Sequence, residues 1–214
     1  IELVREYIGM LKNISTGLIG YEDVELASKL ATILHQHVLI IGSPGTAKSM
    51  FASLYFSFFE GRTFSIQLSK FMSEEFLFGT PNLRKLREEG IIVYEANSYS
   101  ILTANWVFLD ELFDSNDALL RSLLSILNER VFMRGQTFIR VPLITAIATS
   151  NYTRINEITK AVVDRFLFQV RVKSTKEFSE EELENILLFL PPQIQTKIPL
   201  HAVEEFPLLA QRVV

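Results

Sequence analysis

The chain has 214 residues, of which 48% are apolar and 21% are charged, and its formal net charge is −4. This composition is typical of a folded globular domain with one sizeable core, and the acidic charge argues against general nucleic-acid binding because no basic surplus neutralises phosphates. The absence of cysteine excludes disulfides, thiolate zinc sites and cysteine nucleophiles.

No apolar run approaches the roughly 20 residues of a membrane span, and we expect no signal peptide, although Ile1 is not an initiator methionine. We therefore expect a cytoplasmic protein without a membrane span.

Apolar spacing predicts helices and strands that alternate along the chain. The predicted helices are Leu3–Lys12, Tyr21–His35, Met50–Phe59 and Asp117–Asn128. His37–Ile41 is a short, continuously apolar run of the kind that forms a strand buried on both faces. Four more short strand candidates are Thr63–Leu68, Trp106–Leu109, Leu143–Thr149 and Phe166–Val172. This alternation predicts an α/β fold, with a parallel five-stranded sheet flanked by helices.

Two β-rich stretches interrupt the alternation and predict hairpin insertions. The first pairs Gly90–Tyr94 with Ser98–Thr103, and the second pairs Val131–Met133 with Thr137–Val141.

The composition becomes polar after Val172. Ser179 and Glu182 have the spacing of a capping box before a helix that ends at Pro191. We place a domain boundary near residue 175, with an α/β domain over residues 1–175 and a second unit over residues 176–214.

The segment Gly42–Ser49 has the sequence of a phosphate-binding P-loop, between a predicted strand and a predicted helix. In such a loop backbone N–H groups surround the phosphates, Lys48 reaches the β- and γ-phosphates, and Ser49 is a ligand of Mg²⁺. Ala47 departs from the pattern, which has glycine at that position. The alternative is an ordinary Gly/Pro turn with a solvated lysine. The residues expected to bind nucleotide are Ser43, Pro44, Gly45, Thr46, Ala47, Lys48, Ser49 and Met50.

Three later sites in the chain carry polar residues that could act on a bound phosphate: the pair Asp110 and Glu111, then Asn151, then Arg165. Asp110 and Glu111 end a strand that we expect beside the strand of the phosphate loop, where Asp110 would hold Mg²⁺ through water and Glu111 would deprotonate the attacking water. Asn151 would contact the γ-phosphate and that water. Arg165 would stabilise the transferred phosphoryl group from a partner. The alternatives are solvated turn residues and, for Arg165, an ion pair with Asp164.

These motifs together resemble the MoxR family of AAA+ ATPases, and within it the RavA-like branch. The matching segments, over about residues 18 to 172, are Gly42–Ser49 with alanine before the lysine, Phe71–Gly79, Phe108–Leu112, Leu124–Phe132, Thr149–Asn151 and Asp164–Phe166.

The resemblance implies roles that the residues alone do not. Ile19 and Gly20 would pack against adenine, Asn151 would be the first sensor, and Arg165 would be an arginine finger acting in the neighbouring subunit. The two hairpins would line the centre of a hexameric ring, and the partner would be a protein with a von Willebrand factor A domain or another client protein. The family's second sensor arginine lies in a helical lid, of which residues 176–214 would be the incomplete start; Arg212 lacks a helical context.

We therefore expect Mg²⁺-dependent hydrolysis of ATP to ADP, driving chaperone-like remodelling or maturation of a partner protein. One alternative is a nucleic-acid-linked AAA+ motor, for which Arg134 and Arg140 on the second hairpin would supply basic charge. The other is an ATP-bound scaffold with little turnover, but such a scaffold has no need of Glu111.

Overall fold

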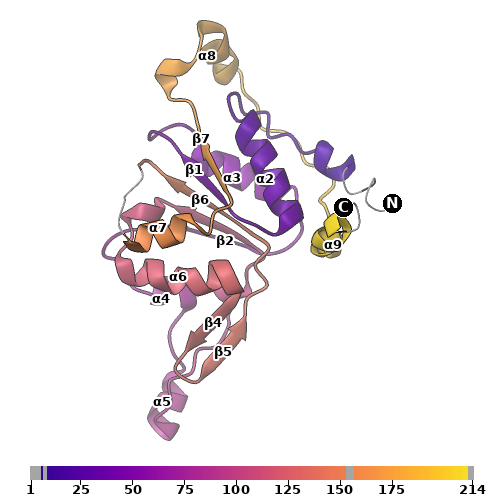
Figure 1. Cartoon of the computed structure of the whole chain (residues 1–214). Coiled ribbons are helices and arrows are strands. Elements are labelled where there is room, and N and C mark those ends of the chain that lie inside the picture. The colour runs from indigo at the N-terminus through magenta and orange to yellow at the C-terminus, as the bar shows by residue number, and fades with distance from the viewer. Residues whose placement is uncertain (1–5, 7–8, 153–156, 212–214) are drawn as a thin grey trace.

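A five-stranded parallel sheet forms the centre of the molecule in the computed structural model, which describes residues 6, 9–152 and 157–211 (Figure 1). The strands, in spatial order, are β2 (Thr63–Gln67), β3 (Trp106–Asp110), β6 (Thr145–Ser150), β1 (Val38–Ile41) and β7 (Phe168–Arg171). Every neighbouring pair is parallel. The predicted α/β fold with a five-stranded parallel sheet is therefore confirmed.

Each face of the sheet has its own apolar core. Val38 and Ile40 of β1 belong to the cluster under α2 (Glu22–Leu34) and α3 (Lys48–Ser57), whereas Leu39 belongs to the cluster under α6 (Asp117–Glu129) and α7 (Glu157–Val163). A strand alternates its side chains between two faces, so the continuous apolar run of β1 is the pattern that two covered faces require.

The first predicted hairpin is wrong. Residues 90–103 contain no paired strands; α4 (Glu75–Phe78) and α5 (Leu83–Glu89) precede them, and Ile101–Thr103 form a 3₁₀ turn. Their backbone groups find partners elsewhere: the N–H of Tyr94 donates to Thr137 Oγ1 at 2.7 Å, and the carbonyl of Val93 accepts from the N–H of Asn82 at 2.8 Å. Tertiary contacts thus override the β-propensity of this stretch.

The second predicted hairpin is confirmed as β4 (Val131–Arg134) and β5 (Thr137–Arg140), which pair antiparallel. Arg134 at its tip forms an ion pair with Glu74, which also accepts a hydrogen bond from Ser122 of α6 at 2.6 Å. The hairpin is therefore tied to the body of the domain. It lies with α5 at the end of the molecule opposite to α8 (Figure 1).

The segment after β7 contains η3 (Thr175–Glu177), α8 (Glu180–Leu187) and α9 (Leu200–Gln211). The predicted capping box of Ser179 and Glu182 is present at the start of α8. Chain residues far beyond 175 return to the α/β core, because α9 packs beside α2 and places Val203 and Phe206 in the core cluster of that face. The domain boundary near residue 175 stays a prediction.

Two further expectations concern residues outside the described part. The first predicted helix, Leu3–Lys12, is described at Glu6 and Gly9–Lys12, which are helical, and otherwise lies outside the described residues. Arg212 also lies outside them.

His37 joins three elements at the edge of the sheet where β1 begins. Its Nδ1 accepts from the N–H of Ala146 at 2.9 Å, so Nε2 carries the proton and donates to the carbonyl of Leu127 at 2.8 Å. Complete burial, together with the nearby charge of Arg130, lowers the pKa of His37 to about 3. His37 is therefore a neutral imidazole that forms hydrogen bonds with two backbone groups.

The buried neutral state of His37 predicts a pH-dependent stability. In the unfolded chain the imidazole protonates below about pH 6.5, whereas the folded chain resists protonation down to a pKa of about 3. The contribution of His37 is therefore complete above about pH 6.5 and is lost as the pH falls, by about 1 kcal/mol per pH unit. Urea unfolding of the parent and of His37→Gln should show the difference in their free energies of unfolding narrowing from about pH 7 to about pH 5. A difference that stays constant over this range would contradict a neutral buried imidazole.

Candidate functional site

The phosphate loop (Gly42–Ser49) leaves the end of β1 and enters α3 through a backbone that glycine makes possible. Gly45 has a φ of +77°, in the left-handed region. Gly42 has no room for a side chain, because a Cβ there would lie 2.2 Å from Cγ2 of Val172. Ala47, just before α3, also has a positive φ of 63°. Alanine adopts this conformation at a cost of about 1–2 kcal/mol, so the departure from glycine at Ala47 strains the loop without changing its path.

Lys48, the first residue of α3, is held inside this loop and is only 6% exposed. Its Nζ donates to the carbonyls of Gly42 at 2.7 Å and Ser43 at 2.8 Å, and to Asn151 Oδ1 at 2.9 Å. Burial lowers the pKa of Lys48, while the charges of Glu111 and Asp110 oppose that shift. The alternative of a solvated lysine is therefore wrong.

Asp110 joins the end of β3 to the loop through hydroxyl groups. Ser49 Oγ donates to Asp110 Oδ2 at 2.9 Å, and Thr149 Oγ1 donates to Asp110 Oδ1. We expected the strand that ends in Asp110 to lie next to β1, the strand before the phosphate loop, and this expectation is wrong. Strand β6 lies between β1 and β3, and its last residues fill the space between the loop and the carboxylates.

Glu111 follows in a strained conformation that its neighbours hold. Its φ of 54° is left-handed, and its N–H lies 3.2 Å from Asp110 Oδ1 and 3.3 Å from Thr149 Oγ1. Its Oε1 accepts from Asn151 Nδ2 at 2.6 Å. The other oxygen, Oε2, is buried and has no hydrogen-bond partner. Asn151 thus bridges Lys48 and Glu111, and one carboxylate oxygen of Glu111 stays without a hydrogen-bond partner.

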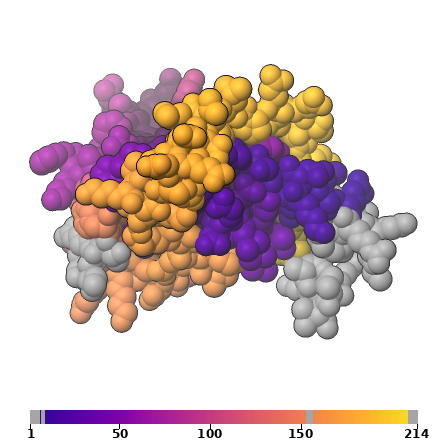
Figure 2. All heavy atoms as spheres, turned by 90° about the horizontal axis from the view of Figure 1, so that it is seen from above, coloured from indigo at the N-terminus to yellow at the C-terminus, as the bar shows by residue number. Residues whose placement is uncertain are grey.

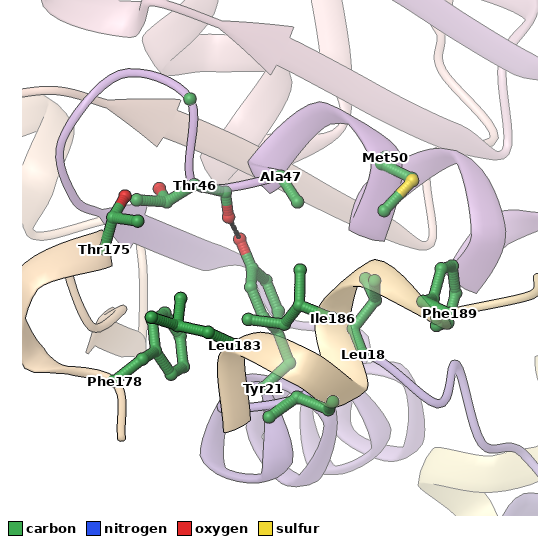
Figure 3. Close-up of a pocket in the computed structure, with 12 residues that line it drawn as sticks. Leu18, Tyr21, Thr46, Ala47, Met50, Thr175, Phe178, Leu183, Ile186 and Phe189 are labelled. Atoms are coloured by element: carbon green, nitrogen blue, oxygen red, sulfur yellow. Dashed lines mark hydrogen bonds between the residues drawn. The ribbon is translucent and has the colours of Figure 1, made fainter. Parts of the chain in front are cut away.

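Two pockets meet at the phosphate loop. The polar pocket is lined by Pro44, Gly45, Thr46, Ala47, Lys48, Ser49, Met50, Asp110, Glu111 and Asn151. The apolar pocket, of about 160 Å³, is lined by Leu18, Ile19, Tyr21, Gly45, Thr46, Ala47, Met50, Thr175, Phe178, Leu183, Ile186 and Phe189 (Figure 3). Four residues of the loop and of α3 line both pockets. A ligand with an apolar ring and an anionic chain could occupy both at once.

The wall of the apolar pocket comes from residues 175–189, which lie against the N-terminal residues (orange on indigo in Figure 2). Ile19 lines this pocket as expected, whereas Gly20 does not; a Cβ on Gly20 would lie 2.7 Å from the ring of Phe178. Sequence reasoning missed this wall, together with Tyr21 and Thr149. The signal for Thr149 was its place in the Thr-Ser-Asn motif, two residues before Asn151.

Arg165 is not brought to this site. It precedes β7, and the parallel register pairs Val38 with Phe168 at the start of the strands and Ile41 with Arg171 at their ends. Arg165 therefore lies at the edge of the sheet opposite to the phosphate loop. Its Nε is buried without a hydrogen-bond partner, and within residues 9–152 and 157–211 its side chain forms no ion pair, with Asp164 or any other acid.

The described residues contain no group of three or more His, Cys, Asp or Glu side chains that could hold a metal ion. Within the same part of the chain, no helix has the length and apolar character that crossing a membrane requires.

Comparisons with known proteins agree with this geometry. A family model described as the MoxR domain in the MoxR-vWA-beta-propeller ternary systems matches residues 5–190. An uncharacterized protein of Methanocaldococcus jannaschii is 33% identical over 156 residues, which are 73% of this chain and 41% of that protein. The chaperone MoxR1 of Mycobacterium tuberculosis is 28% identical over 181 residues, which are 82% of this chain and 46% of that protein. The chain therefore spans less than half the length of these two relatives.

A solved structure from Cytophaga hutchinsonii, described as that of a proposed ATPase, superposes with a TM-score of 0.70. The superposition covers 100% of this chain and 64% of that chain at 18% sequence identity, so it supports the fold alone.

The hydroxyl of Thr149 offers a test of the site's architecture. Thr149→Val keeps the shape of the side chain but removes the donor to Asp110 and the acceptor for the N–H of Glu111. Leaving buried groups without their partners should lower the free energy of unfolding by about 1–3 kcal/mol. Denaturant titration measures this, and Thr145→Val, in the same buried strand but without a carboxylate partner, is the matched control. Equal losses in the two variants would show that the Asp110–Thr149 contact adds nothing of its own.

Proposed function

We propose that this chain, which belongs to the MoxR family of AAA+ ATPases, hydrolyses ATP to ADP and phosphate in a Mg²⁺-dependent reaction. The observation that carries the proposal is the polar pocket. There Lys48, an acidic pair and an amide meet at the start of α3. The first N–H groups of a helix lack helical partners, and the helix dipole makes this end positive. A phosphate group therefore finds both hydrogen-bond donors and positive charge.

Lys48 can exchange its present hydrogen-bond acceptors for phosphate oxygens. Its Nζ now donates to two loop carbonyls and to Asn151, and phosphate oxygens would replace these neutral acceptors with charged ones, which form stronger hydrogen bonds. The same exchange would free Oδ1 of Asn151 from Lys48 to accept a hydrogen bond from water, while the second N–H of Nδ2, beside the one that donates to Glu111, could donate to the γ-phosphate.

Ser49 and Asp110 fit a magnesium ion. Their oxygens lie 2.9 Å apart and are hard donors of the kind that Mg²⁺ prefers. Two protein ligands suffice, because Mg²⁺ keeps several waters and takes the rest of its shell from phosphates. When bound, the ion neutralises charge on the transferred phosphoryl group.

Glu111 would act as the base. Its unused, buried Oε2 can accept a proton from water, while Asn151 fixes the carboxylate through Oε1. Phosphoryl transfer needs in-line positioning and charge stabilisation more than covalent help. The strained backbone of Glu111 aims the side chain, as strain at functional sites does elsewhere.

The apolar pocket would hold the adenine ring of ATP or ADP. Its lining is mainly aliphatic and aromatic, and Phe178 and Phe189 offer ring faces for packing against a base. Because Ile19 lies on one side and α8 on the other, the base would sit between the N-terminal segment and residues 175–189.

Arg165 would complete the site of a neighbouring subunit in a hexameric ring. Its position at the far edge of the sheet prevents it from serving its own phosphate loop, and its Nε is buried without a partner. An arginine supplied by a partner stabilises charge in the transition state.

We further propose that the ring remodels or matures a partner protein that carries a von Willebrand factor A domain. The support is the family model, which is named for systems that combine MoxR, vWA and β-propeller proteins. Membership of the RavA-like branch and the cytoplasmic location stay predictions. The nucleic-acid alternative loses one of its two basic side chains, because Arg134 is engaged by Glu74.

Glu111→Gln separates binding from chemistry. The amide keeps the size of the side chain but cannot accept the proton, so ATP should still bind while turnover falls by about 10²–10⁴-fold. Calorimetry and phosphate release measure the two effects in the full-length protein. Lys48→Ala is the complementary variant and should lose ATP binding while the domain stays folded. Parental turnover in Glu111→Gln would place the base elsewhere.

Arg165→Ala tests the ring. Turnover should fall by about 10³-fold or more while ATP affinity is kept, whereas Arg121→Ala, which removes an exposed arginine of α6, should change neither. Mixing Arg165→Ala with Lys48→Ala should restore activity, because an intact arginine can then serve an intact loop in the next subunit. If both variants assemble and the mixture stays inactive, Arg165 does not act across subunits.

A further inference from the structure

We infer that Tyr21 is a positioning residue that orients the phosphate loop from the apolar pocket. The inference rests on the proposed nucleotide binding and adds a residue that links the base to the phosphates.

The hydroxyl of Tyr21 is tied to the loop backbone. It donates to the carbonyl of Thr46 at 2.6 Å, and the close-up of the pocket shows the ring pointing at that carbonyl (Figure 3). A trans peptide is planar, so its C=O and its N–H point in opposite directions. Holding the carbonyl of Thr46 toward Tyr21 therefore turns the N–H of Ala47 away from the ring of Tyr21, and Ala47 also lines the polar pocket, where this N–H would meet a phosphate.

This tie acts where the loop is strained. Ala47 has a left-handed φ of 63°, which costs a non-glycine residue about 1–2 kcal/mol. Without a fixed carbonyl next to it, the peptide before Ala47 would relax to other orientations more easily. The hydrogen bond from Tyr21 favours the one orientation in which this N–H can donate to a phosphate.

The ring of Tyr21 is itself fixed. It is 4% exposed, stacks on Phe51 of α3 with centroids 5.1 Å apart, and Phe51 stacks in turn on Tyr55 at 5.7 Å. Its backbone carbonyl accepts from the N–H of Glu25 in α2 at 2.8 Å. Burial raises the pKa of the Tyr21 phenol, so the hydroxyl stays a donor at any pH at which the protein would work.

Tyr21 therefore touches both halves of the proposed ligand site. Its ring lines the apolar pocket and its hydroxyl holds the loop that both pockets share. A residue with only a packing role would affect base and phosphates alike, whereas the hydroxyl should matter for phosphates alone.

The test is Tyr21→Phe in the full-length protein, which removes one oxygen and keeps the ring. Affinities for adenosine, ADP, ATP and tripolyphosphate are measured by competition against a fluorescent ADP analogue. The three phosphate ligands should bind about 2–10-fold more weakly, the loss expected for one hydrogen bond, while adenosine binding stays unchanged.

Tyr55→Phe is the matched control. It removes another buried hydroxyl from the same aromatic column, one that pairs with Thr32 Oγ1 at 2.9 Å and not with the loop. Thermal unfolding should show comparable destabilisation in the two variants, but Tyr55→Phe should bind all four ligands like the parent.

The outcomes separate the inference from the proposed function. Equal losses for adenosine and ADP, unchanged ADP affinity in Tyr21→Phe, or the same phosphate-specific loss in Tyr55→Phe would each overturn the positioning role while leaving nucleotide binding intact. If the parent binds neither ADP nor ATP, the proposed function fails first, and the inference fails with it.

Discussion

The order of the strands is the constraint on which the rest of the site depends. Because β6 lies between β1 and β3, the parallel strands end at one edge with a hydroxyl and an amide placed between the phosphate loop and the two carboxylates. Thr149 reaches Asp110 on one side, and Asn151 reaches both Lys48 and Glu111. If β1 paired directly with β3, there would be no room between them for Thr149 and Asn151 at the end of β6. The lysine and the acids would then meet as a plain ion pair, with no amide to exchange when a phosphate enters.

Two residues carry the local strain of this edge, and the same network offsets it. Ala47 and Glu111 are both left-handed, at about 1–2 kcal/mol each. Glu111 is held because its N–H donates to Asp110 Oδ1 and Thr149 Oγ1, and the carbonyl before Ala47 is held by the hydroxyl of Tyr21. Strained positions persist only where the surroundings determine them more than once. Glu111 meets that condition through its two acceptors, and Ala47 meets it because its own carbonyl also accepts from the N–H of Phe51 at 2.9 Å, so both positions are held without a ligand.

Sequence patterns predicted the parts of this arrangement that depend on burial and local chemistry. The five strand candidates became the five strands; the inner strands β1, β3 and β6 are covered on both faces and have almost no exposed side. The glycine-rich loop was found from its place between strand and helix. The first hairpin failed, since its β-rich residues pair with Asn82 and Thr137 instead of with each other. Thr149 was seen only as part of a motif, and its contact with Asp110 was missed because a hydroxyl inside a buried strand looks like that of any core threonine. The wall of the apolar pocket depends on where a polar linker turns, and side-chain pattern does not determine that path.

The wall of the apolar pocket, residues 175–189, has few contacts that hold it to the rest of the domain. No residue of α8 is buried, and its capping box pairs only residues of its own first turn. The ion pair that joins α8 to the residues after β7 is the exposed one between Lys173 and Glu182, a kind of contact that contributes about 0–1 kcal/mol. The apolar side chains Leu183 and Ile186 face the pocket (Figure 3). A base placed there would cover them, and any ligand that binds the ordered wall stabilises it by mass action. The position of α8 and the occupancy of the apolar pocket are therefore linked, whereas α9, anchored through Val203 and Phe206 in the main core, has no such dependence.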